Sequence, residues 1–246
     1  MRTIILHYHL FKNAGTSLDA ALKENFSEEK GEWVTKEFSN NPNENREKVT
    51  EWILNNPKAK CFSSHTALLH DFNIEGIRVI PVIFIRNAID RIYSAYKFEV
   101  NHDSNDWGSA LARNTTFRGY VETRLAMLWD RQCRNFHLSR FSSLIDIDFG
   151  SESQRAVKAV EMLPFVGVVE KFSESLEKLE LLLKESGFQS VSLSAKKLNI
   201  TNQESKDLNQ KMMIIKDALG DDLYEKLVEV NMDDMNLYNV VSRYYS

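Results

Sequence analysis

The chain is predicted to adopt a three-layer α/β fold, with a central parallel sheet flanked by helices and a helical region towards its C-terminus. Strand-like apolar runs alternate with helix-like segments, which is typical of a parallel sheet covered on both faces. The run 79–85 is almost continuously apolar, as expected for a strand buried on both sides. A length of 246 residues is within the range of one α/β core, so a single domain over 1–246 is expected.

The expected elements follow in order along the chain. Strands are predicted at 3–9, 59–64, 79–85 and 165–169, and helices at 15–25, 44–55, 88–100, 152–162 and 173–186. A polar excursion separates the first two helices, and the segment 101–119 is expected to be a surface insertion because it has few regular apolar positions. Helical periodicity returns over 121–134, and 203–245 is predicted to form two or three amphipathic helices.

The composition is that of an ordinary globular protein, with 43% hydrophobic and 27% charged residues and a net charge of −4. The longest apolar run, 79–85, is far short of the roughly 20 residues that span a bilayer, so no membrane span is expected. The first strand begins at once and leaves no room for a signal peptide, which predicts a cytoplasmic protein or a trimmed chain. Cys61 and Cys133 are expected to be buried thiols, with one bridge between them as the alternative.

The first strand breaks into a loop that has the character of an anion site. A strand that passes through small residues into a helix leaves backbone N–H groups unpaired at the positive end of the helix dipole. The layout is P-loop-like, but Lys12 precedes the small residues, whereas a Walker-type loop has its lysine after them. A plain strand–turn–helix with a chance lysine is the alternative. The candidate binding residues are Lys12, Asn13, Ala14, Gly15, Thr16 and Ser17.

A second basic element follows the strand 79–85. Asn87 is a predicted helix N-cap, which puts Arg86 at the carboxyl end of the strand, where open α/β sheets bind ligands. Arg91, Ser94 and Lys97 recur every three residues and are expected to share one helix face. The sequence thus predicts two positive elements at the ends of two strands.

The two elements resemble those of sulfotransferases that use 3′-phosphoadenosine 5′-phosphosulfate (PAPS). The loop 11–17 resembles their 5′-phosphosulfate loop, and the segment 86–94 resembles their 3′-phosphate element, an arginine at a strand end followed by a helix serine. Within that superfamily the likeness is to the branch that contains heparan sulfate 2-O-sulfotransferase and its bacterial relatives. The segments 62–65, 130–134 and 165–172 resemble further motifs of the branch in the right order.

The sequence departs from this branch at three places. The residue before the loop lysine is Phe11 instead of proline, Ser64 stands before the histidine where glycine is common, and Asn87 follows Arg86 where the branch has an acid. No charged or hydroxyl donor is lost, so the departures weaken the assignment to a subfamily more than the assignment of the cofactor.

The resemblance implies the transfer of a sulfuryl group from PAPS to an acceptor hydroxyl, of a carbohydrate or a small molecule, with release of 3′-phosphoadenosine 5′-phosphate (PAP). Lys12 would stabilise the leaving-group oxygen, while Thr16, Ser17 and the loop N–H groups hold the 5′-phosphate. Arg86 and Ser94 would hold the 3′-phosphate. No metal is required by this chemistry, and no nucleic-acid partner is expected.

The resemblance further implies a general base and a nucleotide-covering loop. His65 ends a short strand and corresponds to the catalytic histidine, and histidine can accept a hydroxyl proton near neutral pH. Glu99 and Glu170 are reserve candidates for the base. Lys197 would reach the 3′-phosphate, with a solvated pair formed with Lys196 as the alternative.

Two other classes of function remain open. One is a nucleotide kinase or NTPase with a degenerate P-loop, which would need a carboxylate to hold magnesium. The other is a non-catalytic nucleotide-binding module. His7 and His9 alternate along the first strand, where one could lie near the site, but strand packing is the favoured interpretation for both.

Overall fold

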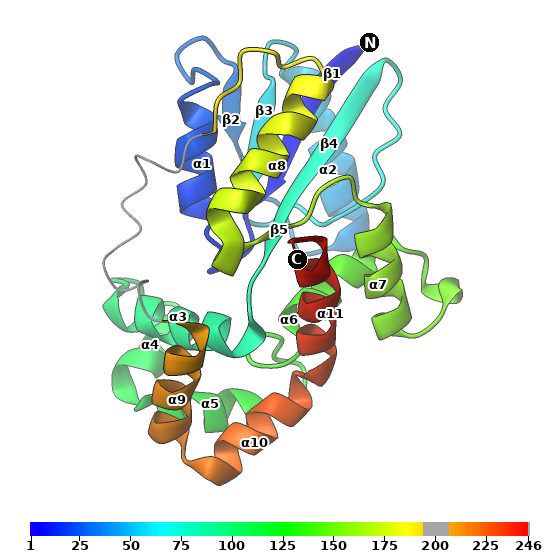
Figure 1. Cartoon of the computed structure of the whole chain (residues 1–246). Helices are drawn as coiled ribbons and strands as arrows, with labels where there is room; N and C mark the ends of the chain where they lie inside the picture. The colour runs from blue at the N-terminus through cyan, green and yellow to red at the C-terminus, as the bar shows by residue number, and fades with distance from the viewer. Residues whose placement is uncertain (194–206, 246) are drawn as a thin grey trace.

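Five parallel strands form the central sheet of the computed structural model, which describes residues 1–193 and 207–245 (Figure 1). Their order across the sheet is β2-β3-β1-β4-β5, and each neighbouring pair is parallel. The predicted α/β fold with a parallel sheet is therefore confirmed. The strands are β1 (Arg2–Tyr8), β2 (Trp33–Thr35), β3 (Cys61–Ser64), β4 (Ile77–Ile85) and β5 (Gly167–Val168).

Helices connect and follow the strands. In the first part of the chain they are α1 (Gly15–Lys23), α2 (Pro42–Asn55), α3 (Ala88–Asn101), α4 (Trp107–Asn114), α5 (Phe117–Ala126) and α6 (Phe136–Phe141). The later ones are α7 (Glu152–Met162), α8 (Phe172–Glu185), α9 (Leu208–Leu219), α10 (Asp221–Val230) and α11 (Met232–Ser242). Short 3₁₀ turns lie at Ser142–Leu144, Ile147–Phe149, Val169–Lys171 and Arg243–Tyr245.

The three layers arise because successive residues of β1 point to opposite faces of the sheet. Ile5 packs with apolar residues of α1 and α8 on one face. Ile4 and Leu6 pack on the other face with residues of α2, α6, α7 and α11. A third apolar cluster joins α3, α4, α5, α9 and α10, which Figure 1 shows beyond the carboxyl ends of the strands.

The position of β1 between β3 and β4 brings three strand ends together. His7 is in register with Ser63 of β3 and with Val82 of β4, and all three strands run in the same direction. The residues that follow Tyr8, Ser64 and Ile85 consequently lie at one edge of the sheet, which is where ligands bind in open α/β sheets.

Several predicted boundaries differ from the structure. The segment 101–119, predicted as a surface insertion, contains α4, which packs against α3, and the start of α5. Its polar residues include the helix caps, since Asp106 accepts from the Ser109 N–H and Thr116 accepts from the Gly119 N–H. The polar excursion contains the short strand β2, and the strand predicted at 165–169 is limited to β5.

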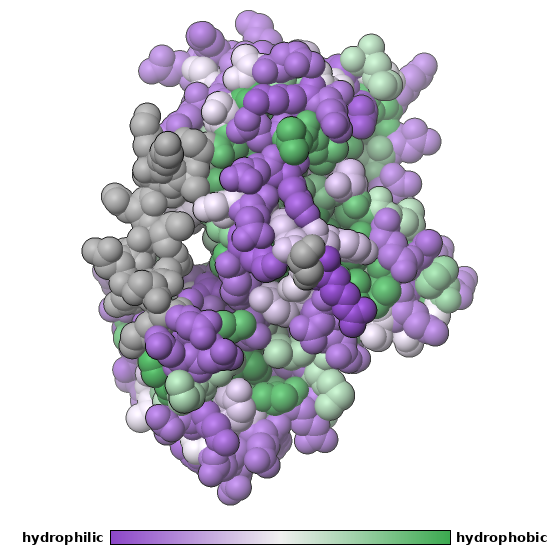
Figure 2. Space-filling view, viewed as in Figure 1, coloured by the Kyte–Doolittle hydropathy of each residue, from purple (hydrophilic) through white to green (hydrophobic). Residues whose placement is uncertain are grey.

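The surface seen in Figure 2 is mainly hydrophilic, with apolar residues in small separate patches. None of the helices in the described parts of the chain is long and apolar enough to cross a membrane. Both cysteines, Cys61 and Cys133, are buried free thiols, as predicted.

Candidate functional site

The loop between β1 and α1 has an unusual backbone. Lys12 and Ala14 both have positive φ angles, 63° and 58°, in the left-handed region that few non-glycine residues occupy. Such turns can form backbone concavities that bind anions. Ala14 gives α1 no side-chain cap, and the first turn of this helix contains no acidic residue. The N–H groups at the start of α1 therefore face the sheet edge without side-chain acceptors, next to the positive end of the helix dipole.

Side chains from distant elements fix this loop. A hydrogen bond of 3.0 Å joins Asn13 Oδ1 to Nε2 of His137 on α6, whose Nδ1 lies 3.1 Å from Oδ2 of Asp234 on α11. All three side chains are buried. At Gly15, an added Cβ would lie only 2.0 Å from Cδ2 of His9, so the start of α1 packs directly on the imidazole ring.

Arg86 connects the loop to the neighbouring strand end. Its Nη1 donates to the Lys12 carbonyl over 3.1 Å, and its Nε and Nη2 donate to Oδ2 of Asp90 over 2.9 and 2.7 Å. Lys211 of α9 brings its Nζ to 3.6 Å from the same carboxylate oxygen. Asn87 caps α3 as predicted, accepting from the N–H groups of residues 89 and 90. Arg86 and Lys211 thus share one carboxylate beside the loop.

A cavity of about 240 Å³ lies between the loop, the end of β4 and the start of α8. Its walls include Ala14 and Ser17 from the loop side, together with Arg86 and Lys211. This volume is smaller than the roughly 300–1,000 Å³ of sites that enclose a whole small molecule. The cavity is therefore large enough for part of a small molecule only.

Two carboxylates also face the cavity, Asp90 and Glu170. Asp90 forms ion pairs with Arg86 and Lys211. Glu170 accepts the backbone N–H of Asn87 over 2.9 Å, and burial raises the pKa of its carboxyl group. The other reserve base, Glu99, is buried elsewhere in an ion pair with Arg124.

His65 lies on the opposite side of β1 from Arg86, at the end of β3. Its backbone N–H donates to Oε1 of Glu37 over 3.2 Å, and its ring centroid lies 3.8 Å from that of His9. Partial burial, followed by the charge of His9, lowers the pKa of His65 below its usual value. The imidazole is therefore predominantly neutral at pH 7, as a proton acceptor must be.

A histidine-rich cluster continues from His65 beneath the loop. Asp19 of α1 lies 2.7 Å from Nδ1 of His7 and 2.9 Å from Nδ1 of His9, and it accepts a hydrogen bond of 2.8 Å from Ser63. The potential ligand atoms of His7, His9 and Asp19 all lie within 4.8 Å of one another. Sequence spacing had not indicated this cluster, because the register of β1 with β3 and the packing of α1 are needed to assemble it.

The remaining predicted residues have different positions. Lys12 has its Nζ 4.6 Å from the centroid of the Phe98 ring, and Thr16 is exposed on the first turn of α1. Ser94 does not line the cavity; it is half-buried on α3, one helical turn beyond Asp90. Lys197 lies outside the described residues. Lys211, which does line the cavity, was not predicted, because only the packing of α9 against α3 brings it there.

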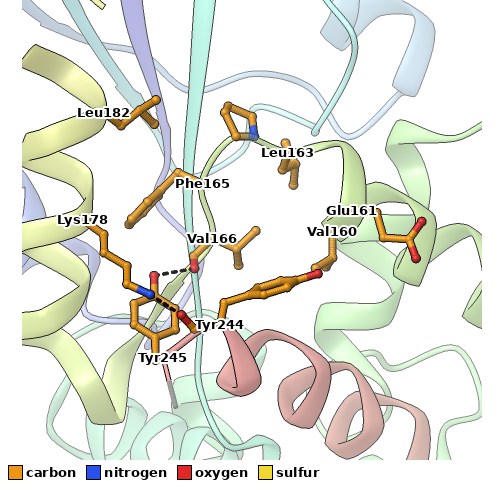
Figure 3. Close-up of a pocket in the computed structure, with 10 residues that line it drawn as sticks. Val160, Glu161, Leu163, Phe165, Val166, Lys178, Leu182, Tyr244 and Tyr245 are labelled. Atoms are coloured by element: carbon orange, nitrogen blue, oxygen red, sulfur yellow. Dashed lines mark hydrogen bonds between the residues drawn. The ribbon is translucent and has the colours of Figure 1, made fainter. Parts of the chain in front are cut away.

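A larger cavity of about 360 Å³ lies between α7, α8 and Tyr244, at residues that precede β5 (Figure 3). Its lysine, Lys178, donates to the Tyr244 carbonyl, and the Tyr245 hydroxyl donates to the Val166 carbonyl over 2.8 Å. Apolar side chains form most of the remaining wall, as Figure 3 shows for Leu163 and others. These two hydrogen bonds attach the C-terminal turn to α8 and to the residue before β5.

Fold and site together define a three-layer α/β protein whose polar groups gather at the carboxyl edge of a parallel sheet. No family model matches the chain. It is similar to an uncharacterized protein of Archaeoglobus fulgidus, with 39% identity over 251 residues that cover 99% of this chain and 98% of the archaeal protein. The chain therefore belongs to the same family as this archaeal protein. The relative is itself uncharacterized, so the similarity establishes kinship and assigns no activity.

Proposed function

We propose that this protein is a PAPS-dependent sulfotransferase that moves a sulfuryl group to a hydroxyl of a carbohydrate or small molecule. The observation that supports it best is the cavity shared by the loop 12–17 and Arg86, which come from the ends of the neighbouring strands β1 and β4. PAPS carries anionic groups at both ends of its ribose, so it needs two positive elements at such a separation.

The donor would lie across the end of β1. Its 5′-phosphosulfate would accept hydrogen bonds from the N–H groups at the start of α1 and from the hydroxyls of Thr16 and Ser17. Its 3′-phosphate would bind on the β4 side, where Arg86 and Lys211 supply positive charge. A phosphate entering there would compete with Asp90 for these two cations, so binding would include a rearrangement of the Arg86–Asp90 ion pair.

The transfer step would take place on the β3 side of the loop. The acceptor oxygen attacks sulfur, the bond from sulfur to the 5′-phosphate oxygen breaks, and PAP leaves with both electrons of that bond. His65 takes the hydroxyl proton, while Lys12 neutralises the charge that develops on the departing phosphate oxygen. This division of roles agrees with the positions of His65 after β3 and of Arg86 after β4, with the loop between them.

The kinase alternative is less well supported. It would require a carboxylate to hold magnesium beside the phosphates. Among the described residues that line the cavity, Asp90 is paired with two cations and Glu170 accepts a backbone N–H. A non-catalytic module does not need a neutral histidine at the end of β3. The position of His65 there favours an enzyme.

Calorimetric titration tests the proposal. PAP should bind with micromolar affinity or better in the absence of magnesium, and ATP should bind more weakly with or without magnesium. At about 100 times its dissociation constant, PAP should stabilise the fold by about 2.7 kcal/mol. For a chain of this size, that corresponds to a melting point higher by about 5–10 °C. Magnesium-dependent ATP binding without PAP binding would favour the kinase, and PAP binding without transfer to any hydroxyl would favour the non-catalytic module.

A further inference from the structure

His9 and His65 are cross-strand neighbours. The parallel register pairs His7 with Ser63 and Tyr8 with Ser64, and the His9 N–H continues the ladder by donating to the Ser64 carbonyl over 2.9 Å. The next pair in this series is His9 with His65, which explains why their ring centroids lie 3.8 Å apart with an angle of 37° between the planes. The contact therefore follows from the sheet itself.

The ring of His9 has little freedom to move. Its Nδ1 is held 2.9 Å from Oδ2 of Asp19, and its Cδ2 and Nε2 edge packs against Gly15, where an added Cβ would lie 2.0 and 2.3 Å away. Only 8% of His9 is exposed. His65, in contrast, is exposed. A fixed ring thus supports a ring that faces solvent.

Asp19 fixes the orientation of the His9 ring. Although burial opposes it, hydrogen bonds from His7 and His9 hold the pKa of Asp19 well below its usual value. The carboxylate is therefore ionised, and an ionised carboxylate can only accept hydrogen bonds. Ser63 donates to it as well. His9 accordingly donates to Asp19 from Nδ1, and its ring orientation is set from α1.

We propose that His9, oriented by Asp19, is a positioning residue that holds the imidazole of His65 at the edge of the phosphosulfate loop for proton transfer. The inference rests on the proposed function, in which His65 is the base. Among the described residues, the charged or titratable groups that act on His65 are His9 just after β1, Asp19 from α1 and Glu37 from the segment after β2.

A metal centre is the competing interpretation of the same residues, since two histidines and an aspartate are common zinc ligands. The hydrogen bonds favour the positioning role. Each Asp19 oxygen already lies within hydrogen-bond distance of one Nδ1 atom, and Oδ1 also accepts from Ser63. The groups satisfy one another without an ion, and zinc binding is therefore made one of the measured outcomes below.

The test compares His9→Asn with the matched variant His7→Asn. His7 lies on β1 and His9 directly follows it, and both contact Asp19 through Nδ1. The asparagine amide nitrogen takes the place of that atom in each variant. Only His9→Asn removes the ring that supports His65, because the ring contact of His7 is with His9, at 5.3 Å. Melting curves and PAP titrations establish that each variant is folded.

We expect His9→Asn to raise the pKa of His65, measured by NMR on histidine-labelled protein, because His65 loses both burial and the opposing charge of His9. His7→Asn should leave the His65 titration unchanged. In His9→Asn, kcat should fall by about 10- to 100-fold while PAP affinity is retained, since a misplaced catalytic group affects the rate more than binding.

Three results would overturn the proposal. One is a His65 titration that is the same in wild type and His9→Asn, and another is an equal shift in both variants, which would indicate a general disturbance of the cluster. The third is stoichiometric zinc binding by EDTA-treated wild-type protein that both variants abolish. The NMR comparison needs neither PAPS nor turnover, so it gives an answer even if PAP fails to bind and the proposed function is wrong.

Discussion

Gly15→Ala is the substitution for which the structure most clearly predicts the direction of the change in stability. The added methyl group would lie 2.0 Å from Cδ2 and 2.5 Å from Cγ of His9. Ordinary contacts between carbon atoms are about 3.5–4.0 Å, so the ring and the start of α1 must separate by about 1.5 Å or more. Rotation of the ring would break its hydrogen bond with Asp19, which leaves displacement of the loop as the main response.

The magnitude follows from two opposing effects. Overpacking of this kind costs about 1–3 kcal/mol of folding free energy. Alanine is a better helix former than glycine by up to about 1 kcal/mol. Gly15 is the first residue of α1, and its φ angle is not positive. We therefore expect a net loss of about 1–2 kcal/mol, equivalent to a melting point lower by about 2–8 °C in a chain of this size.

Denaturant unfolding of four proteins measures the effect: wild type, Gly15→Ala, His9→Ala and the double variant. The three atoms nearest to the added methyl group all belong to the imidazole ring. Gly15→Ala should therefore become neutral or stabilising in the His9→Ala background. The coupling energy should be about 1 kcal/mol or more, as for residues in direct contact. An equal cost of Gly15→Ala in both backgrounds would refute the steric explanation.

Three further predictions concern single side chains. His65→Ala should lower kcat by about 10²–10⁴-fold and remove the acid limb of the pH–rate profile; in wild type this limb should lie below the ordinary histidine pKa of about 6.5, because burial lowers the pKa of His65. Arg86→Ala should weaken PAP binding by about 2–4 kcal/mol but hardly affect adenosine 5′-phosphosulfate, which lacks the 3′-phosphate. Asp19→Asn should cost about 1.5–3 kcal/mol of stability at pH 7. The pKa of Asp19 is depressed in the folded state, so the carboxylate contributes to the free energy of unfolding above its unfolded pKa of about 3.9. This contribution is lost as the pH falls through the folded pKa. The stabilities of wild type and Asp19→Asn should therefore converge in acid.

Each prediction has a result that contradicts it. Retention of most turnover in His65→Ala would move the base elsewhere. Equal losses of PAP and adenosine 5′-phosphosulfate binding in Arg86→Ala would mean that Arg86 acts by holding the Lys12 carbonyl, and Arg86→Lys, which keeps the charge, is the control. A stability difference for Asp19→Asn that stays constant from pH 7 to pH 2 would show that the carboxylate charge contributes nothing.

The sequence predicted the parts of the fold that local patterns encode. β1, β3 and β4 contain apolar runs that give way to polar residues. This order of apolar and polar residues places His65 and Arg86 directly after strands and Lys12 in the loop that follows β1. Helix caps such as Asn87 could be predicted because the cap bonds to N–H groups two and three residues ahead.

Features that depend on distant contacts could not be predicted. β2 has three residues, too few for a period to appear, and it exists because Glu32 and its neighbours pair with the start of β3. In the sequence, Lys211 cannot be distinguished from the other lysines of the C-terminal helices. Only the packing of α9 against α3 brings it next to Asp90. For His9, strand packing was the favoured interpretation, but the β1–β3 register also places its ring against His65.

The hydrogen bonds from Asn13 to His137 and from His137 to Asp234 have a consequence for how the protein is made. They make the shape of a loop near the start of the chain depend on a helix near its end, α11, over sequence separations of 124 and 97 residues. During synthesis the N-terminal strands leave the ribosome long before Asp234 does. The loop can therefore reach its final conformation only after the last helices have been made. Contacts between such remote parts of a chain slow folding, because a long loop has to close first. A nascent chain stopped before α11 would therefore contain every residue of the loop 12–17 and yet lack the support that fixes Asn13 in it.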